Sequence, residues 1–389
     1  MTDTDYYELA NRINLKSVHV LGWRDLDDGE AGGSELHAHE ILKRFADHGL
    51  TVTMRTSVAY GHSKYGQRSG YQISRKGSRY TVFFRSAASW LAHENQRSQA
   101  LIEIWNGMPF FSPVWANVPR LTIIHHVHGE MWSLVFKKNL AAVGKNLEER
   151  IAPLFYKRES ILTPSESTAN ELVTKLKLSE SNIHVVHPGI DSKFSPDFEQ
   201  KSKDPLVISV GRLVPVKRHL DLIKILAEVK GRVDALKVVI AGDGYERQSL
   251  IDFVTENKYQ DWIMLPGRIS DTELASLYRS ASLIVSNSMR EGWGLTLVEA
   301  AACGTPAVAT EIVGHRDSIK NKETGYLVKS EAEFIDKVTY LLSDANELKR
   351  LSLNATKVTE SCSWDLVADK AIELLVKNYI QKYKLNISP

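Results

Sequence analysis

Two glutamates, Glu291 and Glu299, are the most informative pair of chemically active side chains in the sequence, with seven residues between them. Gly292 and Gly294 follow the first glutamate, between an apolar strand and a helix. Glycines there let the backbone approach a ligand closely, and the following amides point at an anion. Carboxylates this far apart are poorly placed to act as one acid–base pair. They could instead bind hydroxyls on two sugar rings of one extended ligand; for an isolated pair, surface or capping roles are the alternative.

Two cations, Arg212 and Lys217, follow the apolar run Leu206–Val210, with Gly211 directly before them. A guanidinium forms forked hydrogen bonds and an ammonium is a compact charge, and both suit a diphosphate. Charge grows on a diphosphate leaving group as the bond to it breaks, so cations fixed beside it would stabilise the transition state. Salt bridging at a helix start is the alternative.

A glycine pair, Gly32 and Gly33, directly precedes a helical pattern near the N-terminus. Backbone amides and the positive end of the helix dipole attract anions at such a position. The pair therefore predicts a second phosphate site, although a plain turn would have the same composition.

Three histidines, His125, His126 and His128, follow the short apolar strand Leu121–Ile124. They lie at the carboxyl end of that strand, where parallel sheets bind ligands. A zinc site would require a fourth ligand, and none is obvious, so no metal is predicted. The alternative is that these side chains are hydrogen-bonded within a loop.

Two glycine-containing segments resemble nucleotide motifs without satisfying them. Residues 242–247 end in Arg247 where a dinucleotide fingerprint requires glycine, and residues 211–217 lack the second glycine of a P-loop. Neither an NAD-binding nor an ATPase interpretation fits.

The elements that must position these residues alternate between strands and helices. Near the N-terminus, a strand at Ser17–Gly22 is followed by a helical pattern from Ala38 to Ala46, a stop at Gly49 and a strand at Leu50–Met54. Further expected strands of the first domain are Leu121–Ile124, Ile161–Thr163 and His184–Val186. Those of the second domain are Leu206–Val210, Leu236–Ala241, Trp262–Leu265, Leu283–Ser286 and Ala307–Ala309. This alternation predicts parallel, doubly wound sheets.

Other segments complete the organisation of the chain. The polar, proline-bracketed stretch Ser195–Pro205 is expected to be an interdomain linker. The spacing Ser270-Asp271-Thr272-Glu273 predicts a capping box, and a final helix is expected from about Trp364 to Lys384.

Composition indicates a globular protein of about two domains, with 389 residues, 43% of them hydrophobic and 25% charged. No run reaches the roughly 18 apolar residues of a membrane span, and the polar, acidic N-terminus does not resemble a signal peptide. Two cysteines, Cys303 and Cys362, cannot form a disulfide framework, which favours a reducing cytoplasm.

Charge is unevenly distributed along the chain. Residues 41–158 contain 17 Lys and Arg against 6 Asp and Glu, a local balance of +11. Such a region could meet an anionic membrane surface or an anionic substrate, or be a solvated basic surface. No nucleic-acid partner is expected, because the arginines are scattered and no recognised nucleic-acid module accompanies them.

The glutamate string resembles the E-x7-E signature of retaining glycosyltransferases of family 4, which have the GT-B fold. Other segments resemble the same family in the same order. They are Gly32-Gly33-Ser34-Glu35, Val210–Lys217, Ala241-Gly242-Asp243-Gly244 and Leu265-Pro266-Gly267-Arg268. The resemblance covers nearly the whole chain and is most specific from about Pro205 to Pro306.

This resemblance implies an α/β architecture of two Rossmann-like domains facing each other across a cleft. Residues 1–195 would be the acceptor-side domain, residues 205–364 the donor domain, and a C-terminal helix at about 365–389 would pack back on the first. It also makes a metal role for Asp25-Leu26-Asp27 improbable, because that spacing belongs to metal-dependent glycosyltransferases of the other major fold.

The resemblance assigns roles to individual residues. Glu291 would hydrogen-bond the donor sugar, Glu299 the ribose, and Gly33 would face the distal phosphate. A histidine at the strand end contacts the donor sugar in this family, and the strand register selects His125, with His126 or His128 as alternatives. The expected catalytic residues are His125, Arg212, Lys217 and Glu291. The expected donor-binding residues are Gly33, Gly211, Arg212, Lys217, Gly242, Gly244, Arg268, Glu291, Gly292, Trp293, Gly294, Leu295 and Glu299.

The implied activity is transfer, with retention, of a sugar from a nucleotide diphosphate-sugar to an acceptor hydroxyl, without metal or other cofactor. Front-face attack is expected, a donor phosphate oxygen assisting deprotonation. The acceptor would be a carbohydrate, a lipid-linked molecule or another hydroxyl compound. A nucleotide-sugar epimerase and a non-catalytic sugar-nucleotide-binding protein are the alternatives. The basic region, with Trp90, Trp105, Trp115 and Trp132, permits peripheral attachment to the inner face of the membrane.

Overall fold

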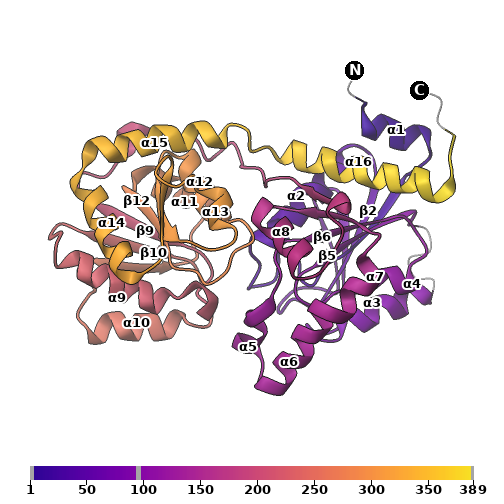
Figure 1. Cartoon of the computed structure of the whole chain (residues 1–389), viewed down its shortest axis with the longest axis horizontal. Helices are drawn as coiled ribbons and strands as arrows, with labels where there is room; N and C mark the ends of the chain where they lie inside the picture. The colour runs from indigo at the N-terminus through magenta and orange to yellow at the C-terminus, as the bar shows by residue number, and fades with distance from the viewer. Residues whose placement is uncertain (1–3, 93–97, 387–389) are drawn as a thin grey trace. The chain divides into compact units, whose positions relative to one another are not determined.

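The computed structural model describes residues 4–92 and 98–386, and the chain divides into two compact units (Figure 1). The first unit comprises residues 1–189 and 364–389, and the second comprises residues 190–363. No helix among the described residues is long and apolar enough to cross a bilayer.

The first unit is built on a sheet whose order is β3-β4-β2-β1-β5-β6-β7-β8. All neighbouring strands pair in parallel except β3 and β4, which are antiparallel. The strands are β1 (Ser17–Leu21), β2 (Thr51–Thr56), β3 (Tyr65–Arg68), β4 (Tyr71–Arg75), β5 (Ala100–Trp105), β6 (Arg120–Ile124), β7 (Ser160–Thr163) and β8 (Ile183–Val185).

Helices cover this sheet and include the C-terminal helix of the chain. They are α1 (Tyr6–Arg12), α2 (Gly33–Asp47), α3 (Val82–Leu91), α4 (Ser112–Trp115), α5 (Trp132–Val135), α6 (Lys138–Asn146), α7 (Ala152–Tyr156), α8 (Glu166–Thr174) and α16 (Trp364–Tyr383). Short helical turns are η1 (Gly129–Met131), η2 (Leu147–Ile151) and η3 (Glu180–Asn182). Helix α16 packs against α2 and also contacts β6 and β7, so the end of the chain belongs to the first unit (Figure 1).

The second unit is an all-parallel sheet with the order β11-β10-β9-β12-β13-β14. Its strands are β9 (Leu206–Val210), β10 (Lys237–Ala241), β11 (Ile263–Gly267), β12 (Leu283–Ser286), β13 (Ala307–Thr310) and β14 (Gly325–Val328). Its helices are α9 (His219–Lys230), α10 (Arg247–Glu256), α11 (Asp271–Ser280), α12 (Leu295–Ala302), α13 (His315–Ser318), α14 (Glu331–Ser343) and α15 (Ala345–Thr359), with the turns η4 (Phe198–Gln200) and η5 (Pro215–Lys217).

Both sheets have a point at which the strand order reverses. In the second unit it lies between β9 and β12, and in the first between β1 and β5. Doubly wound sheets bind ligands in the crevice outside the carboxyl ends of the strands at this point. The α/β fold with two parallel-sheet units is therefore confirmed, and the loops after these four strands are where a site is to be sought.

Local expectations from the sequence are largely met. The capping box at the start of α11 is present, because the Ser270 hydroxyl accepts from the Glu273 amide at 3.3 Å and the Glu273 carboxylate accepts from the Ser270 amide at 2.8 Å. Helix α2 ends at Asp47, and Gly49 has a φ of +83°, as expected for a glycine beyond a helix end.

The stretch expected to be a linker does not behave as one. The boundary falls between residues 189 and 190, and residues 195–205 pack on the second unit. The Lys201 ammonium donates to the Ala281 carbonyl at 2.7 Å and to the Thr305 hydroxyl at 2.6 Å. Polar, proline-rich composition indicates an irregular backbone, but it does not show whether that backbone is hydrogen-bonded to a domain.

The four tryptophans expected near a membrane are not exposed anchors. Trp105 is fully buried in the first unit, and Trp90 and Trp115 pack, partly buried, against a core cluster that includes Leu21. The half-buried Trp132 donates its indole N–H to Glu148 at 2.9 Å. Their apolar surface stabilises the unit itself.

Candidate active site

Lys217 and Glu291 meet at the carboxyl ends of β9 and β12, the strands between which the order of the second sheet reverses. The Lys217 ammonium forms an ion pair with the Glu291 carboxylate, which also accepts from the Ser288 hydroxyl at 2.9 Å. Arg212 lies half buried in the same loop as Lys217. The structure thus brings two of the sequence-predicted residues into contact, although 74 positions separate them.

The charge of Glu291 is set by its neighbours. Burial alone would raise the pKa of this carboxyl, but the Lys217 ammonium, the His315 side chain and the Ser288 hydroxyl together hold its pKa below the ordinary value. Glu291 is therefore ionised near neutral pH, and Lys217 keeps a partner in the absence of an anion. His315 is a residue that the sequence analysis missed. It is fully buried, and its Nδ1 lies 2.8 Å from the Thr310 carbonyl.

Glycines allow the loops around this pair to approach closely. A Cβ on Gly242 would lie 1.8 Å from the Gly211 carbonyl oxygen, and one on Gly244 would lie 2.3 Å from the Leu213 carbonyl oxygen. The Gly211 amide donates to the Ala241 carbonyl at 3.0 Å. The glycines predicted to bind a donor thus first hold the loops after β9 and β10 together, which positions Arg212 and Lys217.

The second glutamate of the string lies inside α12. Glu299 is buried and accepts from the Tyr278 hydroxyl at 2.9 Å. Burial raises the pKa of Glu299 to about 7, even though the Tyr278 hydrogen bond acts in the opposite direction. This side chain is therefore neither a surface group nor a capping group, and its charge depends on pH in the physiological range.

The remaining predicted donor-binding residues lie on the loops of the same unit. Gly294, with a φ of +94°, caps α12 at its N-terminus, where Leu295 begins the helix and the buried Trp293 precedes it. Gly292 is half buried, and Arg268 is exposed directly after β11. A Cβ on Gly314 would lie 2.7 Å from the Glu291 carbonyl oxygen, so another glycine keeps this loop in place.

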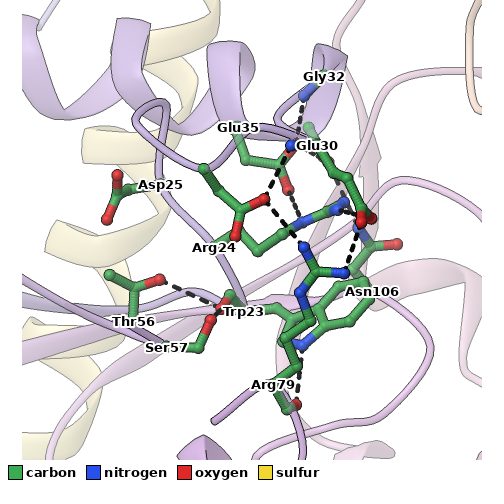
Figure 2. Close-up of polar contacts among 12 residues, drawn as sticks. Trp23, Arg24, Asp25, Glu30, Gly32, Glu35, Thr56, Ser57, Arg79 and Asn106 are labelled. Carbon is green, nitrogen blue, oxygen red and sulfur yellow. Dashed lines mark hydrogen bonds and ion pairs between the residues drawn. The ribbon is translucent and has the colours of Figure 1, made fainter. Parts of the chain in front are cut away.

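In the first unit, Gly33 is the exposed first residue of α2, beside the corresponding reversal point of the sheet. Figure 2 shows Arg24, from the loop after β1, between the carboxylates of Glu30 and Glu35. Glu35 also accepts from the Gly32 amide at 2.8 Å, and Asn106, directly after β5, donates to Ser34 at 3.4 Å. Arg24 is a buried cation that the sequence analysis missed.

His125 lies at the end of β6 and contacts a second histidine. Its Nε2 is 3.0 Å from Nδ1 of His37 on α2, and both rings are buried. Burial lowers the pKa of His125 to about 4 and holds the pKa of His37 well below the ordinary value, to which the neighbouring His125 also contributes. Both imidazoles are therefore neutral near pH 7, with one N–H and one lone pair each. His37 was not predicted, although it follows Gly33 on the same helix.

The other two histidines have different surroundings. His126 and His128 are half buried and stacked, with ring centroids 4.7 Å apart. A Cβ on Gly107 would lie 2.8 Å from Nε2 of His128, so that ring packs closely on the loop after β5.

The carboxylates of the Asp-x-Asp pattern are engaged by arginines. Asp25 accepts from Arg75 at 2.7 and 3.2 Å, and Asp27 pairs with both Arg75 and Arg68. Figure 2 shows Asp25 apart from the Arg24 group. Within residues 4–92 and 98–386, no group of three or more His, Cys, Asp or Glu side chains could hold a metal ion.

Two sheets of this kind, with glycine-rich loops at their reversal points, are the arrangement of the GT-B fold. Solved structures agree. Sucrose-phosphate synthase from Thermosynechococcus elongatus superposes with a TM-score of 0.79 at 18% identity, covering 95% of this chain and 99% of that one. HepE of Anabaena, solved with UDP-glucose, gives a TM-score of 0.72 at 16% identity, covering 93% and 99%.

Sequence comparison identifies the family. The model for glycosyl transferases group 1 matches residues 191–358, and the model for glycosyltransferase family 4 matches residues 31–194. The chain is similar to D-inositol 3-phosphate glycosyltransferase of Nocardia farcinica, 24% identical over 93% of this chain and 88% of the relative, and to that of Gordonia bronchialis, 27% identical over 93% and 87%. The chain belongs to the family 4 glycosyltransferases.

Membership of this family confirms the resemblance inferred from the five motifs. It places the chain among enzymes that transfer a glycosyl group, so the epimerase and the non-catalytic alternatives are set aside.

Proposed function

We propose that this protein moves a sugar, with retention of configuration, from a nucleotide diphosphate-sugar to an acceptor hydroxyl. The observation that carries the proposal is the Lys217–Glu291 ion pair at the reversal point of the second sheet. A cation beside a carboxylate can receive a phosphate while the carboxylate accepts from a sugar hydroxyl. The complexes of HepE with UDP-glucose support a donor of this class.

The second unit would hold most of the donor. Arg212 and Lys217 would bind the diphosphate, and Glu291 would bind the sugar hydroxyls. Glu299 would accept from the ribose. The exposed Arg268 lies where a base would be contacted, and backbone groups of residues 292–295 would complete the site.

In the first unit, Gly33 and His125 are the residues proposed to bind a donor. The exposed Gly33 amide at the start of α2 suits the distal phosphate. His125, held by His37 and neutral, can hydrogen-bond the donor sugar without introducing a charge. In the proposed step the acceptor oxygen attacks the anomeric carbon on the face that the diphosphate leaves, and a phosphate oxygen takes the acceptor proton.

We propose that no metal takes part, and that the protein acts in the cytoplasm or on the inner face of its membrane. The acceptor would be a carbohydrate, a lipid-linked molecule or another hydroxyl compound. D-inositol 3-phosphate is one acceptor to be tested, because the relatives from Nocardia farcinica and Gordonia bronchialis are named D-inositol 3-phosphate glycosyltransferases.

The test has two stages. First, calorimetric titration with UDP-, GDP- and ADP-sugars identifies the donor. Second, transfer to a panel of acceptors is measured as the release of nucleoside diphosphate, with and without a chelator. The anomeric configuration of the product is read by NMR. We expect binding of one donor, transfer that survives the chelator, and a retained configuration. Inversion would contradict the retaining mechanism, and activity lost with the chelator and restored by a divalent cation would contradict the metal-free one.

A further inference from the structure

A continuous helical segment in the first unit has an unusual surface. Residues 138–156 comprise α6, the π-helical turn η2 and α7, and the backbone at Leu147, Ile151 and Ala152 stays in the right-handed helical region at both junctions. Pro153, in the first turn of α7, has no amide hydrogen to donate, which is compatible with the wider π turn before it. The segment can therefore be treated as one helix with two faces.

The inner face of this helix packs on the unit. Ala141, Glu148, Ala152 and Tyr156 are all buried. Glu148 accepts from the amides of the loop that follows His125, at 2.8 and 3.0 Å, and from the Trp132 indole at 2.9 Å. These bonds fix the helix to that loop.

The outer face of the helix is apolar where a solvated face would be polar. We define it by five side chains at helical spacing with their exposed fractions: Leu140 (54%), Val143 (59%), Ile151 (45%), Leu154 (64%) and Phe155 (45%). Single exposed apolar residues are common, but five on one helical segment, two near its N-terminal end and three near its C-terminal end, indicate a surface that contacts something apolar.

Cations border this outer face. Five exposed basic residues lie in this segment or directly beside it: Lys138 and Arg150 within it, Lys137 before it, and Lys157 and Arg158 after it. A hollow of about 540 Å³, lined by Phe136, Lys137, Lys138, Asn139 and Leu140, opens at its N-terminal end. Of the nearby acids, Glu130 pairs with Lys145, Glu159 pairs with Arg120, and Glu148 faces inwards. Glu149, on the same helical segment, is half buried. In Figure 1, α5 and α6 lie at the lower edge of the first unit.

We propose that the outer face of residues 138–156 binds the surface of an anionic lipid bilayer. Apolar side chains would enter the boundary between headgroups and acyl chains, while the bordering cations meet lipid phosphates. A second copy of this chain fits less well, because a two-fold contact through the same face would bring like charges together. The proposal is independent of donor chemistry, since none of these residues belongs to the donor site.

The test is co-sedimentation of the full-length protein with vesicles. Vesicles of phosphatidylcholine with phosphatidylglycerol are compared with phosphatidylcholine alone, at about 0.1 M and about 0.5 M salt. Three variants are compared with the wild type. The apolar variant is Leu140→Ser/Val143→Ser/Leu154→Ser, and the cation variant is Lys137→Gln/Lys138→Gln/Arg150→Gln. The control, Lys224→Gln/Lys349→Gln, neutralises two exposed lysines of the second unit. Circular dichroism and donor titration verify that each protein is folded.

We expect binding to the anionic vesicles that is lost at high salt and falls about tenfold or more in each of the two test variants. The control should bind like the wild type. Wild-type protein that ignores anionic vesicles, or test variants that bind as well as the control, would overturn the proposal. So would a wild-type dimer in sedimentation velocity that the apolar variant dissociates, because the face would then be an interface between copies. Wild-type protein that binds anionic vesicles but binds no nucleotide-sugar donor would count against the proposed function alone.

Discussion

At the scale of single residues, the candidate site depends on contacts between side chains far apart in the sequence. Arg212, Lys217 and Glu291 could be predicted as site residues from the sequence because each follows a short apolar strand. That Lys217 would pair with Glu291 was not, because the contact depends on β12 lying next to β9 in the sheet. His315 comes from the loop after β13, the other neighbour of β12 in the sheet, so its contact also depends on strand order. Ser288 is a local partner, three residues before Glu291.

Glu299 predicts a pH-dependent stability. Folding raises its pKa from 4.5 to about 7. The protonated Glu299 carboxyl therefore makes its full contribution to the free energy of unfolding below the unfolded pKa of 4.5. That contribution is lost as the pH rises through the folded pKa of about 7. As the pH rises from about 5 to about 8, the wild type should therefore lose stability relative to Glu299→Gln, which cannot ionise at this position. The difference between their free energies of unfolding should change by at most about 3 kcal/mol.

The measurement for Glu299 is urea denaturation at both pH values. The exposed Glu256→Gln serves as the control and should track the wild type. A difference between Glu299→Gln and wild type that does not change with pH would show that the raised pKa is wrong.

His37 predicts a positioning effect on the reaction. Its ring holds Nε2 of His125 at 3.0 Å, so His37→Ala should leave His125 less well oriented. We expect kcat to fall by about tenfold with little change in the KM for the donor, and His37→Gln to recover part of the loss. The control is His39→Ala on the same helix, whose ring contacts the Tyr71 hydroxyl instead. Equal kcat values for the two alanine variants would contradict this role.

At the scale of elements, uninterrupted apolar runs gave accurate strands. Both β9 and β12 have the bounds expected from sequence. Strand β5 was missed because Glu103 lies within it, and that carboxylate is buried and accepts from the Phe110 amide and the Tyr156 hydroxyl, each at 2.6 Å. These partners come from other parts of the chain. Strand β3 was missed because its residues, Tyr65–Arg68, are mostly polar.

The glycine contacts between loops give a prediction at this scale. Gly242 has a φ of +146°, and a Cβ there would meet the Gly211 carbonyl. Gly242→Ala should therefore destabilise the second unit by more than about 3 kcal/mol or displace the loop after β9. Either result abolishes donor binding in a calorimetric titration. Gly29→Ala, where nothing lies within 4 Å of the new Cβ, is the control. Donor affinity in Gly242→Ala equal to that of the control would disprove the steric account.

At the scale of the whole molecule, local charge counts proved a poor guide to the surface. Arginines of the basic region, residues 41–158, form ion pairs with acids that precede this region in the sequence. Arg75 pairs with Asp25 and Asp27, and Arg79 pairs with Asp28 and Glu30. The division of the chain into units was only partly readable: the return of α16 to the first unit was expected, but residues 190–205 pack on the second unit rather than forming a linker.

The return of α16 predicts that damage to the C-terminal helix affects the first unit. Ala371 is fully buried on α16, so Ala371→Asp would place an unpaired charge in the core and cost about 3 kcal/mol or more. Scanning calorimetry should show a lowered transition for one unit, while donor titration at low temperature stays near the wild-type affinity. The control is Leu366→Asp, at an exposed position of the same helix. Loss of donor binding in Ala371→Asp alone would mean that the donor site requires α16.

The central claim, that Lys217 beside Glu291 handles the diphosphate of the donor, is tested most directly by the rate of sugar transfer in Lys217→Ala. The exposed Lys224→Ala, on α9 of the same unit, is the matched control. Removing one transition-state cation should lower kcat by about 100-fold to 1000-fold in a folded protein, while the control keeps the wild-type rate. Transfer by folded Lys217→Ala at the rate of the control would contradict the claim.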